Sequence, residues 1–296
     1  MESTSDARLS SSAKLKIREI VDADVDSIIT LLTRGFPNSR DYWDVGFARL
    51  KTRSLPPNLP RYGYVFEANK NPVGVILLIS STRRTGDREE VFSNLSSWYV
   101  EPHYRSHAAQ LFKHALANKK TTFLNVSAAS HVRPLIEAFG FKRYSEGQVL
   151  SVLALARDQE RGANIIDIDH VSNSELGQNE RALLKAQAGY GCITLCCATS
   201  RIIRPFAFIP RFIKGFIPCA QLAYCRNIDD FVAVAGSIGR FLLWRGWPFV
   251  LIDTSGPVSG IPGKYFADVA PKYYLGTAIP VANDLAETEA TIFGFG

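Results

Sequence analysis

The segment from Trp98 to Leu111 holds residues whose types and order can bind a phosphorylated ligand. A strand-like run ends at Val100, and Arg105 then precedes a predicted helix. Backbone N–H groups at the start of a helix have no partner within the helix, and the helix dipole places positive charge there. Such donors beside a guanidinium group form an anion site. The residues predicted to line this site are Val100, Arg105, Ser106, His107, Ala108, Ala109 and Gln110.

This segment resembles the acyl-CoA-binding motif of the GNAT superfamily of acyl-CoA N-acyltransferases. The resemblance is carried by Val100-Glu101-Pro102, by the aromatic–arginine pair Tyr104-Arg105, and by the tight loop expected to open the helix. It implies acetyl-CoA or another acyl-CoA as co-substrate, with the Val100 backbone free for the pantetheine arm. The family has small residues at the positions of Ala108 and Gln110. Ala108 is a mild change, whereas the larger Gln110 narrows the approach to the pyrophosphate.

A second part of the resemblance is a strand and a helix that end in Phe139-Gly140-Phe141. In many family members a tyrosine four residues before that glycine protonates the leaving thiolate, and Ile136 stands there in this chain. His131, predicted at the C-terminal end of the strand, is the nearest titratable side chain that could supply the proton. A loop histidine also often serves as a structural hydrogen-bonding group, so both roles of His131 stay open.

The elements that position these residues follow from hydrophobic periodicity and turn residues. In the first half, strands are predicted at Leu15–Val21, Tyr62–Ala68, Pro72–Ser81, Leu95–Val100, Thr121–Val126 and Val149–Leu155. Helices are predicted at Asp22–Phe36, Asp41–Lys51, about Ser106–Ala117 and His131–Phe139. Gly140 is expected to end the last helix in a left-handed conformation.

A similar series follows in the second half. Helices are predicted at Ser174–Ala188 and Asp229–Trp244, and strands at Cys192–Ala198, Ile202–Ile209, Cys219–Cys225 and Phe249–Ile252. A loop at Asp253–Lys264, a short helix and a final strand at Glu289–Phe295 complete the series. Both halves place an amphipathic helix before a buried strand, a polar loop and a short helix. This repetition indicates tandem domains, with chance similarity of short α/β units as the alternative.

The predicted fold class is α/β, with mixed sheets in two GNAT-like domains in tandem. Residues 1–14 are expected to form a disordered tail, 15–156 the acyl-CoA-binding domain, 157–170 a linker and 171–296 a second, degenerate domain. Each domain is expected to have its own mixed sheet with a splayed pair of strands. In the second domain Asn227-Ile228-Asp229-Asp230 replaces the arginine loop, and its carboxylates would cap the helix and repel a pyrophosphate.

Composition narrows the functional classes. The 296 residues are 46% hydrophobic and 21% charged, as in ordinary globular proteins. A formal charge of +6 without a clustered basic stripe predicts no nucleic-acid partner. No apolar run reaches the ~20 residues of a transmembrane helix, and the N-terminus lacks an apolar signal region. The expectation is a cytoplasmic protein without stable membrane insertion.

Three further patterns have alternative interpretations. Asp253-Thr254-Ser255-Gly256 is similar to an aspartic-protease loop, but without a second copy a turn at the end of a strand is preferred. His103 and His107 are spaced like metal ligands, yet no third ligand is nearby in the sequence, so no metal site is predicted. The segment Arg204–Phe216 alternates cations with phenylalanines, which fits a membrane surface, an acyl chain, or interior strands with outward charges.

The sequence therefore predicts an enzyme that moves an acetyl or other acyl group from acyl-CoA to an amine of a small molecule or peptide by direct attack. Its rate would come from positioning and from backbone donors that polarise the thioester. The alternative, favoured by Gln110 and Ile136, is a GNAT-fold binding or scaffold protein that has lost transfer activity.

Overall fold

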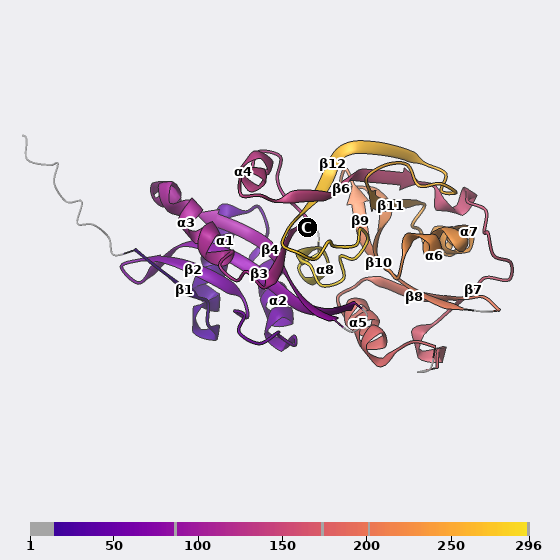
Figure 1. Cartoon of the computed structure of the whole chain (residues 1–296), viewed down its shortest axis with the longest axis horizontal. Coiled ribbons are helices and arrows are strands. Elements are labelled where there is room, and N and C mark those ends of the chain that lie inside the picture. Colours follow the sequence, from indigo (N-terminus) through magenta and orange to yellow (C-terminus); the bar gives the residue numbers. More distant parts are fainter. Residues whose placement is uncertain (1–14, 86–87, 173–174, 201, 295–296) are drawn as a thin grey trace, which may run out of the picture. The chain divides into compact units, whose positions relative to one another are not determined.

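The chain forms two compact units (Figure 1). The computed structural model describes residues 15–85, 88–172, 175–200 and 202–294, so the predicted tail at 1–14 lies outside the described residues. Unit 1 comprises the chain up to Arg53 together with Pro57–Leu78 and Ser97–Asn118, and unit 2 comprises the remainder. This division passes through two long strands of the first half. The domain boundaries near residues 157–170 remain a prediction.

Unit 1 contains the first strands and three α-helices. The strands β1 (Leu15–Glu19), β2 (Gly63–Ala68) and the first part of β3 (Asn71–Thr85) pair antiparallel in that order. The helical segments are η1 (Asp22–Asp24), α1 (Val25–Gly35), α2 (Arg40–Thr52), η2 (Pro102–His107) and α3 (Ala108–Ala115). The β2–β3 turn has φ of 52° at Asn69 and 69° at Lys70, which confirms the predicted hairpin.

Unit 2 contains the last part of β3, most of β4 (Arg88–Val100) and every element from β5 onward. Its other strands are β5 (Thr121–Asn125), β6 (Lys142–Ser151), β7 (Asn164–Ile166), β8 (Ile193–Ala198), β9 (Ile203–Ile213), β10 (Ile217–Cys225), β11 (Phe249–Thr254) and β12 (Lys264–Leu275). Its helices are α4 (Arg133–Ala138), η3 (Leu153–Leu155), η4 (Ile168–His170), α5 (Gln178–Gly189), α6 (Ile228–Ala233), α7 (Ala235–Trp244) and α8 (Glu289–Ile292). None of the helices described in the chain is long and apolar enough to cross a membrane.

The two halves of the chain exchange strands within unit 2. The strand order there is β4-β5-β12-β6-β11-β10-β9-β8-β7. Strand β12, from the second half, lies antiparallel between β5 and β6 of the first half, and β6 pairs on its other side with β11 (Figure 1). The prediction of a separate sheet for each half is therefore wrong, because the exchanged strands join the two series.

The pairing pattern nevertheless repeats. Strands β4 and β5 pair in parallel and are followed by the antiparallel β12. Strands β10 and β11 also pair in parallel and are followed by the antiparallel β6. In each half a helix follows the first strand of the parallel pair, α3 after β4 and α6 after β10. The tandem interpretation rests on this repetition of pairing.

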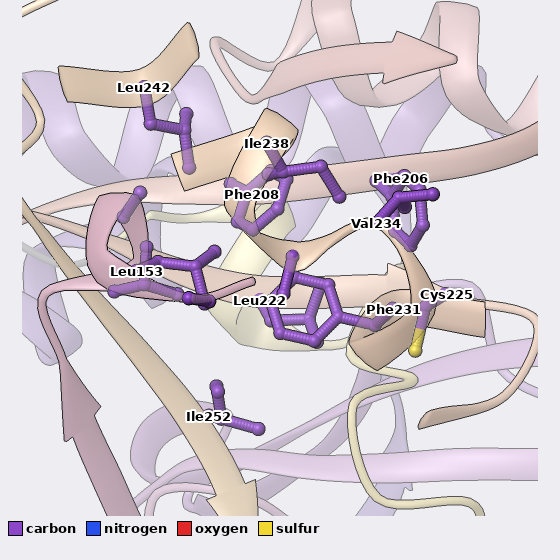
Figure 2. Packing of buried hydrophobic residues seen from close by; sticks show 14 of the residues in the cluster. Leu153, Phe206, Phe208, Leu222, Cys225, Phe231, Val234, Ile238, Leu242 and Ile252 are labelled. Atoms are coloured by element: carbon purple, nitrogen blue, oxygen red, sulfur yellow. The ribbon is translucent and has the colours of Figure 1, made fainter. Parts of the chain in front are cut away.

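The helices of the second half cover an apolar face of the sheet (Figure 2). The buried cluster includes Leu153, Phe206, Phe208, Leu222, Phe231, Val234, Ile238, Leu242 and Ile252. Helix α7 lies directly on η3. A Cβ atom on Gly239 would come within 2.2 Å of the Leu153 carbonyl carbon, and one on Gly236 within 2.4 Å of the Ala156 oxygen. Glycine permits this close approach of two backbones.

Three predictions of elements near the C-terminus are wrong. The short helix predicted after Lys264 is instead strand β12, in which Asp268 and Ala270 have positive φ and the pairing register shifts. Such an interruption breaks the alternation by which strands are recognised. The strand predicted at 289–295 contains helix α8 as far as residue 292, and residue 295 lies outside the described residues. The helix predicted at 229–244 is broken at Val234 into α6 and α7.

Differences elsewhere are smaller. The predicted linker contains β7, which pairs with β8. The strand predicted at Val149–Leu155 begins earlier, as β6, and gives way to η3. The helix predicted from Ser174 begins at Gln178, and Ser174 itself lies outside the described residues.

Candidate functional site

The parallel pairing of β4 and β5 ends at a defined residue pair. Their register runs from Val91 opposite Thr121 to Asn94 opposite Leu124. The buried Asn94 side chain donates from Nδ2 to the Leu124 oxygen at 3.3 Å and to the Leu95 oxygen at 3.2 Å. Strand β4 then continues to residue 100, beyond the last residue that pairs with β5. The place where the pairing ends is called the first fork below.

The predicted anion segment follows β4 as a 3₁₀ helix rather than as a tight loop. The Tyr104 N–H donates to the Glu101 oxygen at 2.9 Å, and the Ala108 N–H donates to the Arg105 oxygen. The α-helix therefore begins at Ala108, two residues later than the predicted Ser106. The correction matters for binding, because backbone donors paired within the 3₁₀ helix are not free for a phosphate.

The side chains of this segment are mostly open to solvent. Arg105, Ser106 and Gln110 are exposed, and His107 is half-buried against the Phe66 ring, with ring centroids 6.2 Å apart. An exposed guanidinium next to the start of α3 can still attract a phosphate. Within the described residues no group of three or more histidine, cysteine or acidic side chains could hold a metal ion.

His131 lies in the turn between β5 and α4, where its side chain is exposed. Arg133 fixes this turn, because its Nη1 donates to the Asp268 oxygen at 3.2 Å and its Nε to the Ala128 oxygen at 3.4 Å. His131 itself forms no hydrogen bond or ion pair with any residue that the structure describes. A structural hydrogen-bonding role for His131 thus has no partner among those residues.

Glu289 is an ionisable side chain at the first fork that the sequence analysis missed. Its N–H donates to Asn94 Oδ1 at 2.8 Å, and its half-buried carboxylate accepts hydrogen bonds from the hydroxyls of Ser127 and Ser96. Desolvation by burial raises the pKa of this carboxyl to about 7, although the Ser96 hydrogen bond and the charge of Lys272 lower it.

Glu289 was missed because it lies 162 residues after Ser127 in the chain, and its segment was predicted to be a strand. The available signal was a single carboxylate within the apolar stretch around residues 288–293. A charged group there needs either a partner or a function, since an isolated charge is costly to bury.

The second half has a corresponding fork between β10 and β11, and residues near the C-terminus occupy it. Strands β10 and β11 pair in parallel only from Cys219 to Gln221. Beyond that point the Leu285 N–H donates to the Ala223 oxygen at 2.7 Å, and Tyr224 forms a bridge with Asp284. Asp284 and Leu285 therefore occupy the edge of β10 beyond its parallel pairing with β11.

Buried polar side chains close the same region. Asp253, at the end of β11, accepts hydrogen bonds from Gln148 Nε2 at 2.9 Å and from Gln221 Nε2 at 2.8 Å. Arg211 Nη1 donates to Gln221 Oε1 at 2.8 Å, and Lys272 Nζ lies 3.4 Å from Asp253. The Asp253 carboxylate is therefore held by structural contacts at the end of a strand. This agrees with the interpretation that was preferred over an aspartic-protease loop.

The start of α6 is capped by Asn227 rather than by the aspartates. Asn227 Oδ1 accepts from the Asp230 N–H at 2.7 Å, and the Asp230 carboxylate instead accepts from Arg204 Nε at 2.9 Å. A cavity of about 450 Å³ adjoins this helix, and Asp229 is one of the residues that line it. No cation lines it, so it offers nothing to a pyrophosphate; its lining is Gln159, Ile228, Asp229, Val232, Thr254, Pro257, Val258 and Ser259.

The first and second parts of the segment Arg204–Phe216 differ in their burial. Arg204 is buried and pairs with Glu160 and Asp230, and the first two phenylalanines belong to the core. Phe212 and Phe216 are 59% and 71% exposed. The first part of β9 is therefore an interior strand as predicted, but its charge does not point outward, because Arg204 is buried in ion pairs.

Comparison with known proteins was made on sequence and on structure. No protein-family model and no curated protein matches the chain. A putative acetyltransferase from Pyrococcus horikoshii is 13% identical, with a TM-score of 0.53 and 96% of each chain covered. A GCN5-related N-acetyltransferase from Anabaena variabilis is 10% identical, with a TM-score of 0.62 over 88% of this chain and 72% of that chain.

A GCN5-related N-acetyltransferase from Kribbella flavida is also 10% identical, with a TM-score of 0.57 over 90% of this chain and 72% of that chain. At such identities the likeness is one of fold. It extends over both halves of the chain rather than over one of them. The chain therefore has the fold of the GCN5-related N-acetyltransferases, the GNAT fold.

Proposed function

We propose that the protein is an acyltransferase whose first half binds acetyl-CoA or another acyl-CoA and transfers the acyl group to an amine of a small molecule or peptide. The observation that carries the proposal is the exposed Arg105, which follows a strand that has left its parallel partner in a GNAT fold. The five cysteines are free thiols, which fits a reducing cytoplasm.

In this proposal Arg105 and the start of α3 hold the pyrophosphate by charge and by the helix dipole. The pantetheine arm runs along β4 near Val100. The remaining contacts come from Ser106, His107, Ala108, Ala109 and Gln110. The amine attacks the thioester carbonyl directly, and His131 is the proposed acid that protonates the leaving thiolate.

The second half serves as a structural partner in this proposal. Its fork is taken by Asp284 and Leu285, and its helix start presents Asp229 where a phosphate would need a cation. An anionic ligand placed there would meet repulsion. One working site per chain is therefore expected.

The test is calorimetric titration of the full-length chain with acetyl-CoA. Arg105→Ala should weaken binding by about tenfold or more, since a hydrogen bond to a charged group contributes about 1.5–3 kcal/mol. Arg161→Ala removes an equally exposed charge from the predicted linker, outside the first half, and is the matched control. Asp230 is unsuitable as a control, because its carboxylate holds Arg204. Equal losses in both variants would contradict the choice of the first half.

The alternative is a GNAT-fold binding protein without transfer activity. The observation in its favour is that the Ala108 N–H is already paired with the Arg105 oxygen, which leaves fewer donors for a phosphate. Release of free thiol from acetyl-CoA in the presence of a panel of amines distinguishes the two. Binding without thiol release would support the alternative.

A further inference from the structure

The closed end of the β9–β10 hairpin in unit 2 extends beyond both neighbouring strands. Strand β8 pairs with β9 only as far as Phe208, and β11 pairs with β10 only from Cys219 onward. In the registers of the described strands, residues 209–218 therefore pair only within the hairpin. A tight turn closes it, with φ of 53° at Lys214 and 80° at Gly215. This end of the hairpin has no strand beside it on either side.

The apolar face of β9 continues past the helices that cover it. Alternate residues of a strand point to the same face, so Phe212 lies on the face of Phe206 and Phe208, which belong to the core beneath α6 and α7. Those two phenylalanines are buried, whereas Phe212 is mostly exposed. The covering helix α7 ends at Trp244. The hairpin end is thus an uncovered continuation of a buried face.

Other aromatic side chains gather at the same end of unit 2. The rings of Phe212 and Trp247 pack with their centroids 5.8 Å apart, which brings the hairpin and the segment after α7 together. Trp244, three residues earlier, is 91% exposed, and Phe216 beside the turn is also exposed. Single exposed apolar residues are ordinary, but a gathered group of them marks an interaction surface.

The charges around these rings are positive. Lys214 lies in the turn and Arg245 follows Trp244, and both cations are exposed. The Arg245 guanidinium carbon lies 3.7 Å from the centroid of the Phe241 ring. Neither cation forms an ion pair with any residue that the structure describes. Residues 211–218 and 241–249 contain no aspartate or glutamate. The surface therefore combines aromatic rings with uncompensated positive charge.

This combination is complementary to an anionic membrane surface. Tryptophan side chains are enriched at the level of lipid headgroups, where an apolar ring meets a polar layer. Lysine and arginine near the bilayer are attracted by negatively charged lipids. A nucleic acid would require a longer basic stripe than these two cations provide. The absence of acidic residues favours a negatively charged partner over a second copy of this chain.

We propose that this end of unit 2 docks on the surface of an anionic phospholipid membrane. The docking patch consists of Phe212, Lys214, Phe216, Trp244 and Arg245. Its rings enter the layer between headgroups and acyl chains, and its two cations stay at the level of the lipid phosphates. The docking is peripheral, because none of the described helices can cross a membrane. It requires no acyl transfer and is independent of the proposed function.

The experiment is co-sedimentation of the full-length chain with vesicles of phosphatidylcholine alone or mixed with phosphatidylserine. The chain should bind the mixed vesicles, bind pure phosphatidylcholine much more weakly, and dissociate from the mixed vesicles as salt is added. Reversal of both charges in Lys214→Glu/Arg245→Glu should weaken binding to the mixed vesicles by about tenfold or more. Lys142→Glu reverses an exposed charge on β6 and is the matched control, with no expected effect.

Phe216→Ser/Trp244→Ser tests the aromatic part of the docking patch. Loss of two rings that leave water should weaken binding by about tenfold or more. Ile279→Ser changes a side chain that is 74% exposed elsewhere in unit 2 and should bind like the unaltered chain. All these side chains are exposed, so the Tm of each variant should be unchanged.

Three results would overturn the proposal. The first is that the unaltered chain does not bind the mixed vesicles, or binds both kinds of vesicle equally. The second is that the docking-patch variants bind as tightly as their controls. The third is that the unaltered chain is a dimer that Phe216→Ser/Trp244→Ser dissociates, which would assign the docking patch to a second copy of the chain.

Discussion

Replacing Gly239 by alanine tests the contact between α7 and η3, which joins a helix of the second half to the segment after β6. The added Cβ would lie 2.2 Å from the Leu153 carbonyl carbon and 2.3 Å from the Ala154 nitrogen. Carbon atoms pack at about 3.5–4.0 Å, so the helix must move by about 1 Å or more. The obstructing atoms belong to the backbone, so they cannot move away by a change of rotamer as side-chain atoms could.

Overpacking of this kind costs about 1–3 kcal/mol, and the better helix propensity of alanine returns up to about 1 kcal/mol. The net destabilisation should be about 1–2 kcal/mol. A domain of this size loses about 2–4 °C of Tm per kcal/mol, so the expected fall is about 5 °C.

The assay is calorimetric unfolding of the full-length chain, with Gly189→Ala as the control. Gly189 ends α5, and a Cβ there would meet nothing within 4 Å. This variant should raise Tm slightly, because only the gain in propensity remains. A rise in Tm for Gly239→Ala equal to that of the control would refute the close approach of α7 to η3.

Four further predictions follow from buried or ionisable groups. Asp253→Asn should destabilise the chain by about 3 kcal/mol in urea unfolding, because the new NH2 group would face one of the two glutamine donors and the buried charge pair with Lys272 would be lost. Tyr144→Phe should leave stability unchanged or raise it, since the buried Tyr144 hydroxyl has no hydrogen-bond partner among the described residues; a loss above about 1 kcal/mol would contradict this. The Glu289 pKa lies near 7 in the folded chain against an ordinary 4.5, so the folded state binds more protons between these values. Stability should therefore fall by up to about 3 kcal/mol as pH rises from 4.5 to 7, and Glu289→Gln should flatten that slope. His131→Ala should lower turnover by about ten- to a thousandfold without changing acetyl-CoA affinity, and superimposable pH–rate profiles would show that His131 takes no part in proton transfer.

Local patterns predicted most elements of the first half well. The hairpin at Asn69 and Lys70 depends on turn residues that act within a few positions, and α1 and α2 depend on clear helical periodicity. The left-handed conformation expected at Gly140 is present, with φ of 92°. The position of Arg105 after β4 was likewise readable, because strand, proline and helix follow one another directly.

Features that depend on distant contacts could not be predicted in this way. No short stretch of sequence indicates that β12 inserts between β5 and β6. The irregular region near Asp268 and Ala270 also interrupts the alternation of apolar and polar residues by which a strand is recognised. Glu289 looks like one more surface carboxylate until Asn94, Ser96 and Ser127 are brought to it. A site assembled from segments far apart in sequence gives no motif to find.

The exchange of β6 and β12 also bears on the order in which the protein is made. Strand β5 is complete at Asn125, but the neighbour that covers its free edge, β12, ends only at Leu275. During synthesis on the ribosome, the edge of β5 therefore stays unpaired with β12 until residue 275 has emerged. Pairing over such a separation is slow to form, and an open edge invites association with other chains. Synthesis of residues 1–156 alone would leave that edge permanently uncovered, so this half is not a portable module that could be moved into another protein.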